Sequence, residues 1–172
     1  MINQEALVKN ITICIKKHIT LKKTKTQVMA YVKIWVHIVW TTKNREPVLT
    51  NPKRKLLFSH MRENARLKGI YLDFIGGYLE HIHCLISLNS DQTIAKTIQL
   101  IKGESAYWFN HNIKKGKKLE WQDEYFAVSV SESAVNAVRS YIKNQEQHHK
   151  KKTFQEEYDD IMQKFGFSKF PG

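Results

Sequence analysis

The alternation of apolar and polar residues between Tyr31 and Thr41 constrains the fold more than any other feature of the chain. One face of this segment carries Val32, Ile34, Val36, Ile38 and Trp40, and the other carries Lys33, Trp35 and His37. A period of two over this length is typical of a half-buried β-strand. We therefore expect a sheet that has one well-covered face.

Three further strands are predicted. The segment from Tyr71 to Gly76 is rich in aromatic and β-branched residues, and Gly76-Gly77 permits a bend before a strand from His81 to Leu88. These two strands are expected to form a hairpin. A fourth short strand is indicated by the alternation of Phe126, Val128 and Val130.

Helical periods separate these strands. The first follows a turn marked by Pro47 and Pro52 and continues to about Leu67, and the second covers residues 94–108 with Asp91 as its N-cap. A third begins with a cap at residues 131–133 and continues to about residue 147. The order predicts an α+β fold: a ferredoxin-like split βαβ (β-α-β-β-α-β) antiparallel sheet, two helices on one face, and an additional C-terminal helix. The other face is left for that last helix or for a ligand.

The charge of the chain indicates a polyanionic partner. The 172 residues include 28 Lys+Arg against 16 Asp+Glu, a formal charge of +12, so nucleic acid is the first candidate. We expect one domain at residues 30–172, preceded by a basic N-terminal arm at residues 1–29 that is poorly ordered or lies upstream of a true start at Met29. Cys14 and Cys84 form no CxxC pair, which excludes a disulfide framework and favours a cytoplasmic location. No segment approaches the roughly 20 apolar residues that cross a membrane.

Two histidines share one face of the third strand. In His81-Ile82-His83 the alternation places both imidazoles opposite Ile82 and Cys84, on the less covered face of the sheet. Such a pair is close enough to share one cation. A histidine pair on a strand is, however, more often structural.

Tyr141 and Gln145 lie one helical turn apart on the third helix, so a phenol and an amide oxygen share one face. Tyr141 also continues an apolar stripe with Val138, which would make it an ordinary core residue. If the helix lies beside the open face, Gln145 reaches the histidine pair and Tyr141 reaches a phosphate held there. We therefore predict a phosphodiester-cleaving site with Mg²⁺ or Mn²⁺ bound by His81, His83 and Gln145, next to Tyr141.

These motifs resemble those of the HUH single-tyrosine transposases, which include insertion-sequence single-strand DNA transposases and REP-associated tyrosine transposases. The resemblance covers roughly residues 31–167 and depends on the histidine pair at 81–83 and on Tyr-x-x-x-Gln at 141–145. The segments at 37–43 and 102–105 are also similar to those of family members. Glu80 stands where many relatives have Asp and keeps a carboxylate beside the pair. Three further histidines are expected near the site. His148 and His149 follow Gln145 closely and could replace or supplement it as ligands, or support the site from outside, and the alternation places His37 on the same face as the histidine pair.

The resemblance implies a DNA transposase that nicks and rejoins single-stranded DNA at ends that carry imperfect hairpins. The tyrosine oxygen would attack a phosphodiester, form a 5′-phosphotyrosine and free a 3′-OH, with no need for ATP. A homodimer is also implied, and in some family members the two subunits share active sites. The candidates for DNA contact are basic residues: Lys53, Arg54, Lys55, Lys102, Lys114, Lys115, Lys117, Lys118 and Lys150.

Three alternatives stay open. A domesticated descendant of such a transposase would bind its hairpin and no longer move DNA. A non-catalytic nucleic-acid-binding module on a ferredoxin-like sheet is disfavoured, because the third strand lacks the Lys/Arg-Gly-aromatic-Gly string of RNA-recognition strands. A cupin-like metal enzyme would need more strands than the sequence predicts.

Overall fold

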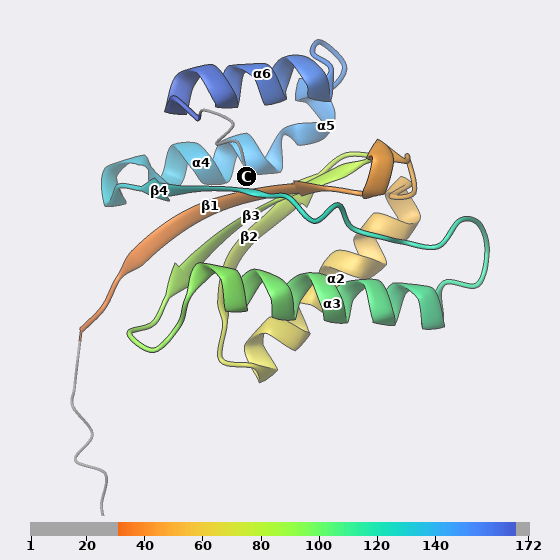
Figure 1. Cartoon of the computed structure of the whole chain (residues 1–172), viewed down its shortest axis with the longest axis horizontal. Helices are drawn as coiled ribbons and strands as arrows, with labels where there is room; N and C mark the ends of the chain where they lie inside the picture. Colours follow the sequence, from red (N-terminus) through yellow and green to blue (C-terminus); the bar gives the residue numbers. More distant parts are fainter. Residues whose placement is uncertain (1–30, 168–172) are drawn as a thin grey trace, which may run out of the picture. The chain divides into compact units, whose positions relative to one another are not determined.

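The sheet has the strand order β2-β3-β1-β4, and every neighbouring pair is antiparallel (Figure 1). The structure is a computed structural model, and it describes residues 31–167. The order of elements confirms the predicted ferredoxin-like α+β fold. In chain order they are β1 (Ile34–Thr41), η1 (Lys43–Arg45), α2 (Asn51–Leu67), β2 (Tyr71–Gly77), β3 (His81–Leu88), α3 (Ile94–Asn112), β4 (Phe126–Val130), η2 (Glu132–Ala134), α4 (Val135–Lys143), α5 (Gln145–His148) and α6 (Phe154–Phe165).

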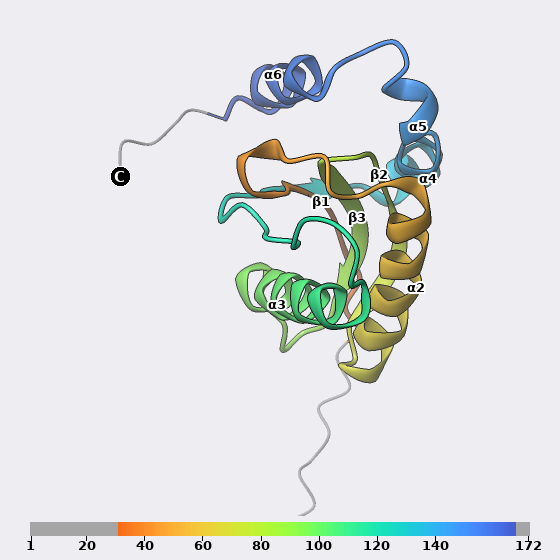
Figure 2. The ribbon, with the colours of Figure 1, turned by 90° about the vertical axis from the view of Figure 1, so that its right-hand side faces the viewer.

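Hydrophobic clusters lie on both faces of the sheet. On one face, residues such as Ile38 and Ile82 pack in the larger cluster, which α2 and α3 cover (Figures 1 and 2). On the other face, Trp35 and Leu85 pack against Ile142 of α4. This division follows from the period of two in β1 and β3, because successive side chains of a strand point to opposite faces. The predicted third helix thus covers the second face.

Gly76 allows α4 to lie very close to β2. A Cβ atom on Gly76 would lie 2.8 Å from Cγ2 of Ile142 and would collide with the carbonyl oxygen of the same residue. Arg139 of α4 adds a bidentate pair with Asp73 of β2, with N···O distances of 2.7 and 3.0 Å. The backbone contact and the ion pair together fix α4 on the sheet.

Helix boundaries differ from the prediction at four places. Pro52 lies in the first turn of α2, where no N–H is needed, and not in a turn before the helix. The N-cap of α3 is Thr93, whose hydroxyl accepts a backbone hydrogen bond from the first turn, and not Asp91. No side chain at residues 131–133 caps α4, because the short 3-10 helix η2 leads into it, and the predicted helix is interrupted at Asn144 between α4 and α5.

The sequence analysis did not predict α6, which lies on the same side of the sheet as α4 (Figures 1 and 2). A capping box begins this helix: the Thr153 hydroxyl accepts from the Glu156 backbone N–H, and the Glu156 carboxylate accepts from the Thr153 N–H. Thr-x-x-Glu is the sequence signature of such a box, so the helix had a local signal. The presence of α6 means that the expected open face is covered.

Two expectations concern the ends of the chain and membranes. The predicted basic arm at residues 1–29 lies outside the described residues. Within residues 31–167, no helix combines the length and the apolar character that crossing a membrane requires.

Candidate active site

The strand β3 holds His81 and His83 on one face, and both side chains are completely buried. Nδ1 of His81 lies 3.2 Å from a carboxylate oxygen of Glu80, and Nδ1 of His83 lies 3.1 Å from Nε2 of His37 on β1. Both imidazoles are therefore held through Nδ1, and their Nε2 atoms are left for other partners. Histidines that bind metals are commonly oriented in this way by a partner on the second ring nitrogen.

The helices α4 and α5 bring the two predicted helical residues to this pair. Oε1 of Gln145 lies 3.4 Å from Nε2 of His81, and Gln145 is itself 1% exposed. The ring of Tyr141 is half-buried, and its centroid lies 5.6 Å from that of His83. The structure thus gathers the four residues that the sequence singled out. The histidines project from the face that was left for the third helix or for a ligand, and α4 and α5 cover them there together with α6, which was not predicted.

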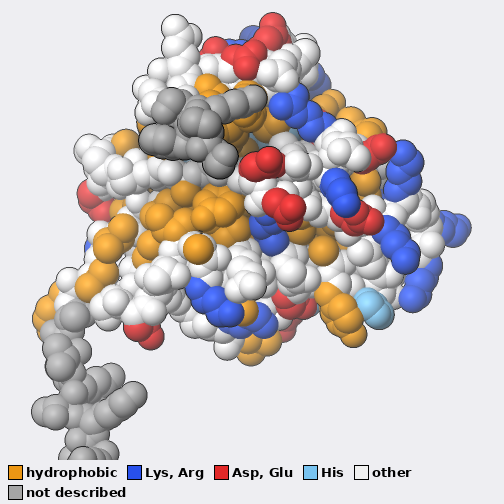
Figure 3. Space-filling model, in the orientation of Figure 1, with side chains coloured by type: hydrophobic (Ala, Val, Ile, Leu, Met, Phe, Trp, Pro, Cys, Tyr) orange, Lys and Arg blue, Asp and Glu red, His pale blue; other side chains and the backbone are white. Residues whose placement is uncertain are grey.

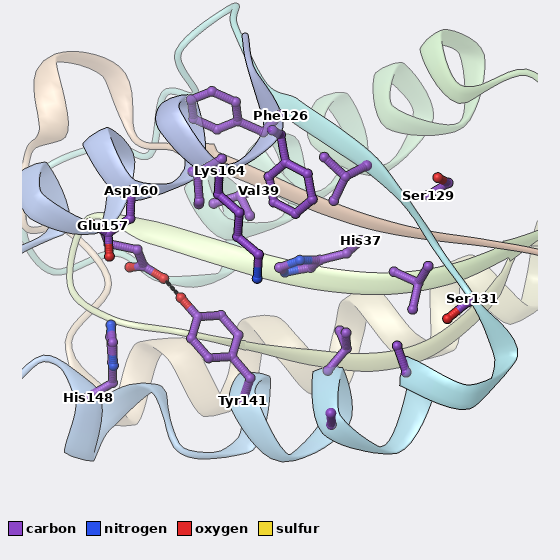
Figure 4. A pocket seen from close by; sticks show the side chains of 17 residues that line it. His37, Val39, Phe126, Ser129, Ser131, Tyr141, His148, Glu157, Asp160 and Lys164 are labelled. Carbon is purple, nitrogen blue, oxygen red and sulfur yellow. Dashed lines mark hydrogen bonds between the residues drawn. The ribbon is translucent and has the colours of Figure 1, made fainter.

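Glu157 of α6 is the residue of this cluster that sequence reasoning missed. Its Oε1 atom accepts a hydrogen bond from the Tyr141 hydroxyl (Figure 4) and another from Nε2 of Gln145 at 3.4 Å. The same oxygen lies 3.4 Å from Nε2 of His83. The capping box could have indicated the helix, but nothing local shows that the helix folds back onto β3.

Burial sets the charges of these groups. It lowers the pKa of His83, an effect that the neighbouring His81 strengthens, and it lowers the pKa of His37 to about 4. Burial also raises the pKa of Glu157 to about 8, and the nearby Glu80 adds to the shift. A neutral imidazole keeps the lone pair that metal binding needs. The surroundings thus favour neutral groups as long as no cation is bound.

Several buried polar atoms of this cluster have no hydrogen-bond partner. They include Nε2 of His83 and Oε2 of Glu157. One ligand atom each from His81, His83 and Glu157 lie within 4.8 Å of one another. Buried polar atoms are normally paired, so unpaired atoms that face one another call for an explanation, such as an ion. Two imidazoles and a carboxylate are a donor set that suits a divalent cation.

The predicted supporting histidines also lie at this site. The His149 ring stacks on that of Tyr78 at 5.1 Å, and its Nε2 atom lies 3.1 Å from Oε2 of Glu157. The ring of His148 lies 5.5 Å from that of Tyr141. Burial lowers the pKa of His149 to about 4 and also lowers that of His148. Both residues therefore surround the cluster as neutral groups at pH 7.

A cavity of about 720 Å³ opens beside Tyr141. Figure 4 shows Tyr141 and His37 pointing into it from α4 and β1, with Glu157, Asp160 and Lys164 of α6 on another side. Strand β4 supplies much of the remaining wall, and hydrophobic side chains gather on the surface near this strand in Figure 3. The volume lies within the roughly 300–1,000 Å³ of ligand sites. The phenol of Tyr141 can thus meet a ligand that enters from the cavity.

The predicted basic residues fall into two groups. Arg54 is 5% exposed, donates to the Leu49 carbonyl at 3.0 Å and pairs with Glu146. The Lys102 ammonium donates to two backbone carbonyls, of Gln122 and of Asp123. These two cations are therefore engaged within the fold. Lys53 is half-buried, whereas the others are exposed, four of them in the loop between α3 and β4: Lys55, Lys114, Lys115, Lys117, Lys118 and Lys150.

Comparisons with known proteins indicate the family and the fold of the chain. The family model described as "Transposase IS200 like" matches residues 30–145. The ISDra2 transposase TnpA of Deinococcus radiodurans is 27% identical over 115 residues, which are 63% of this chain and 81% of that protein. The crystal structure of a candidate transposase from Deinococcus radiodurans superposes with a TM-score of 0.55 at 25% identity, over 71% of this chain and 97% of the other. A REP-associated tyrosine transposase bound to a REP hairpin gives a TM-score of 0.53 at 18% identity, over 72% and 74% of the two chains.

Proposed function

The chain belongs to the IS200-like transposase family, and from this premise we propose that it cuts and rejoins single-stranded DNA with Tyr141 as the nucleophile. One observation carries the proposal. Tyr141 lines the cavity and also lies next to the buried cluster that contains His81, His83 and Gln145. A nucleophile that lines a cavity and lies next to a set of metal-ligating groups is what phosphodiester transfer needs.

In the proposed reaction the phenolic oxygen of Tyr141 attacks the phosphorus of a phosphodiester, and its proton leaves to water. The bond from phosphorus to the 3′ oxygen breaks, and that oxygen takes up a proton to become a 3′-OH. The DNA then carries a 5′-phosphotyrosine link to the protein. Because one phosphoester replaces another, the bond energy is kept for rejoining and no ATP is consumed.

The residues of the cluster fit a divalent cation, Mg²⁺ or Mn²⁺. His81 and His83 would hold it through their Nε2 atoms, and the amide oxygen of Gln145 lies close enough to join them. Glu80 and His37 hold the two rings in the orientation that this requires. When bound, such an ion polarises a phosphate oxygen and neutralises developing negative charge.

We further propose that the DNA partner carries an imperfect hairpin. A hairpin is bound in the structure of the REP-associated tyrosine transposase with which this chain shares its fold. The exposed lysines of the loop between α3 and β4, at residues 114–118, offer a surface for the DNA backbone. In Figure 3 many Lys and Arg side chains gather at the end of the molecule where this loop lies.

The proposed reaction needs no residue from a second subunit, because one chain supplies the whole cluster. A homodimer and a cytoplasmic location remain part of the proposal. Sedimentation of the purified full chain, with and without hairpin DNA, measures the first. A monomer in both conditions would contradict the dimer and leave the proposed chemistry as it is.

The test uses the full chain with Mn²⁺ and single-stranded oligonucleotides from the flanks of its encoding DNA, chosen for imperfect palindromes. We expect a covalent protein–DNA adduct on a denaturing gel, in which the protein is linked to the 5′ phosphate at the break and the other fragment ends in a 3′-OH. Tyr141→Phe should abolish the adduct and keep hairpin binding. Tyr78→Phe, which removes the hydroxyl of a ring that stacks on His149, should behave as wild type.

An adduct that persists in Tyr141→Phe would contradict the assignment of the nucleophile. Hairpin binding by the wild type without any cleavage would favour the second candidate, a domesticated hairpin-binding protein. The structural relative bound to a REP hairpin is the observation behind that candidate.

A further inference from the structure

The helix α6 is held firmly against the cluster. The Phe154 ring stacks on that of His81 at 4.5 Å, and the Tyr158 ring contacts that of Phe126 on β4 at 5.0 Å. The Arg45 guanidinium lies over both α6 rings, at 5.3 and 5.4 Å. Glu157 lies between these two aromatic residues in sequence, so the packing of its neighbours fixes where its carboxylate lies.

The carboxylate of Glu157 is buried without a permanent cation. Its side chain is 3% exposed, and within residues 31–167 its ion-pair partners are all histidines. Ionisation of a buried carboxyl group needs an opposite charge or a metal ion nearby, since the free energy of removing that charge from water is large. Within residues 31–167, no Lys or Arg forms an ion pair with this carboxylate.

The distances suit a shared ion. Two ligand atoms that each lie about 2.1 Å from one cation are at most about 4.2 Å apart. The carboxylate oxygens of Glu157 lie 3.4 Å from Nε2 of His83 and 3.9 Å from Nε2 of His81. Both separations fall within this limit. The Nε2 atom of His83 and the Oε2 atom of Glu157 also lack any hydrogen bond that such an ion would have to break.

We infer that Glu157 is a protein ligand of the divalent cation, joining His81 and His83 when no DNA is bound. This inference depends on the proposed function only for the cation at the histidine pair, and it adds a carboxylate ligand from α6. A bound ion would favour the ionised form of Glu157, and the carboxylate would then offset part of the charge of the ion.

The same carboxylate also occupies the place of the substrate. Glu157 Oε1 accepts from the Tyr141 hydroxyl and lies beside His83. A phosphate under attack has to lie next to both the phenol and the cation. The Glu157 carboxylate and the DNA phosphate therefore compete for the same position, next to the phenol and the cation. Binding of DNA requires the Glu157 carboxylate to leave this position.

The first test measures Mn²⁺ binding to the full chain without DNA, by electron paramagnetic resonance of the free ion. We expect Glu157→Gln, which keeps the shape of the side chain, to weaken Mn²⁺ binding by about tenfold or more. Asp159→Asn removes the same charge from an exposed position of the same helix, and it should change the affinity by less than about twofold. Affinity in Glu157→Gln equal to that in Asp159→Asn would overturn the inference.

His83→Ala separates this inference from the proposed function. If His83→Ala loses Mn²⁺ binding and Glu157→Gln binds Mn²⁺ as the wild type does, the role of Glu157 as a ligand is rejected and the metal site at the histidine pair is kept. If His83→Ala also binds Mn²⁺ as the wild type does, the metal site of the proposed function fails as well, and with it the inference.

A second measurement does not depend on how any variant folds. Amide hydrogen exchange of the wild type is followed with and without Mn²⁺, in the absence of DNA. If Glu157 binds the ion, Mn²⁺ should slow exchange in residues 154–165 of α6 as well as in β3. Slower exchange in β3 with no change in α6 would contradict the inference.

Discussion

Gly76→Ala tests whether the contact between β2 and α4 sets the position of Tyr141. A Cβ atom at this site would lie 2.8 Å from Cγ2 of Ile142 and would collide with the carbonyl oxygen of that residue. Carbon atoms pack at about 3.5–4.0 Å, so α4 must move away from β2 by roughly 1 Å. Ile142 follows Tyr141 directly, and the phenol therefore moves with it.

Two effects on stability oppose each other at this site. Forcing a methyl group into a filled core costs about 1–3 kcal/mol, and here the obstacle is backbone, which cannot turn aside as a side chain can. Replacing Gly by Ala at an ordinary backbone position stabilises a protein by about 0.4–1 kcal/mol, and Gly76 has no positive φ. We expect a net destabilisation of about 1–2 kcal/mol. A displacement of about 1 Å at the phenol should also reduce cleavage by about a hundredfold.

Urea unfolding of Gly76→Ala and Gly103→Ala measures whether each substitution raises or lowers the free energy of unfolding. Gly103 lies in α3, and a Cβ atom there would have no neighbour within 4 Å. Gly103→Ala should therefore raise the unfolding midpoint, since Ala is favoured over Gly in a helix by about 1 kcal/mol. A Gly76→Ala protein as stable as wild type, with unchanged cleavage, would refute the reasoning about the contact.

Three further predictions concern α6, the core and the surface. Thr153→Ala removes the hydroxyl of the capping box and should lower the stability of α6 by about 1 kcal/mol. Amide hydrogen exchange should then become about fivefold faster in α6 alone, and unchanged exchange would contradict the prediction. Burial raises the pKa of the Cys84 thiol, so iodoacetamide should alkylate Cys84 only after the protein unfolds. Peptide mass mapping at pH 8 measures this, and alkylation of Cys84 in the native protein at the rate of a free thiol would contradict it. Lys114→Ala should reduce the slope of log binding constant against log salt concentration for single-stranded DNA by about 0.7. Lys102→Ala, which removes two hydrogen bonds to backbone carbonyls, should leave this slope unchanged. The reverse pattern would contradict the assignment of these lysines.

Much of the fold followed from local patterns. The bounds of β3 and the order of the elements could be predicted because apolar periods of two and of 3.6 are local properties. The spacing of Tyr141 and Gln145 likewise placed them on one helical face, and that relation survives the interruption at Asn144.

Other features depend on packing between distant segments. Whether the face of His81 and His83 is covered is decided by the position of α6, about seventy residues further along the chain. The same packing brings Glu157 to the histidines and explains why no motif announced it. Arg54 and Lys102 looked like surface cations in the sequence, and only their neighbours in the fold show that backbone carbonyls bind them.

The central claim is that the Tyr141 oxygen becomes bonded to DNA at this cluster. The most direct test is to isolate the DNA-linked protein after reaction with Mn²⁺, digest protein and DNA, and locate the nucleotide by peptide mass spectrometry. We predict a single linked peptide with the nucleotide on Tyr141. A nucleotide on Tyr78 or Tyr158, or linked protein that forms equally well in Tyr141→Phe, would contradict the account.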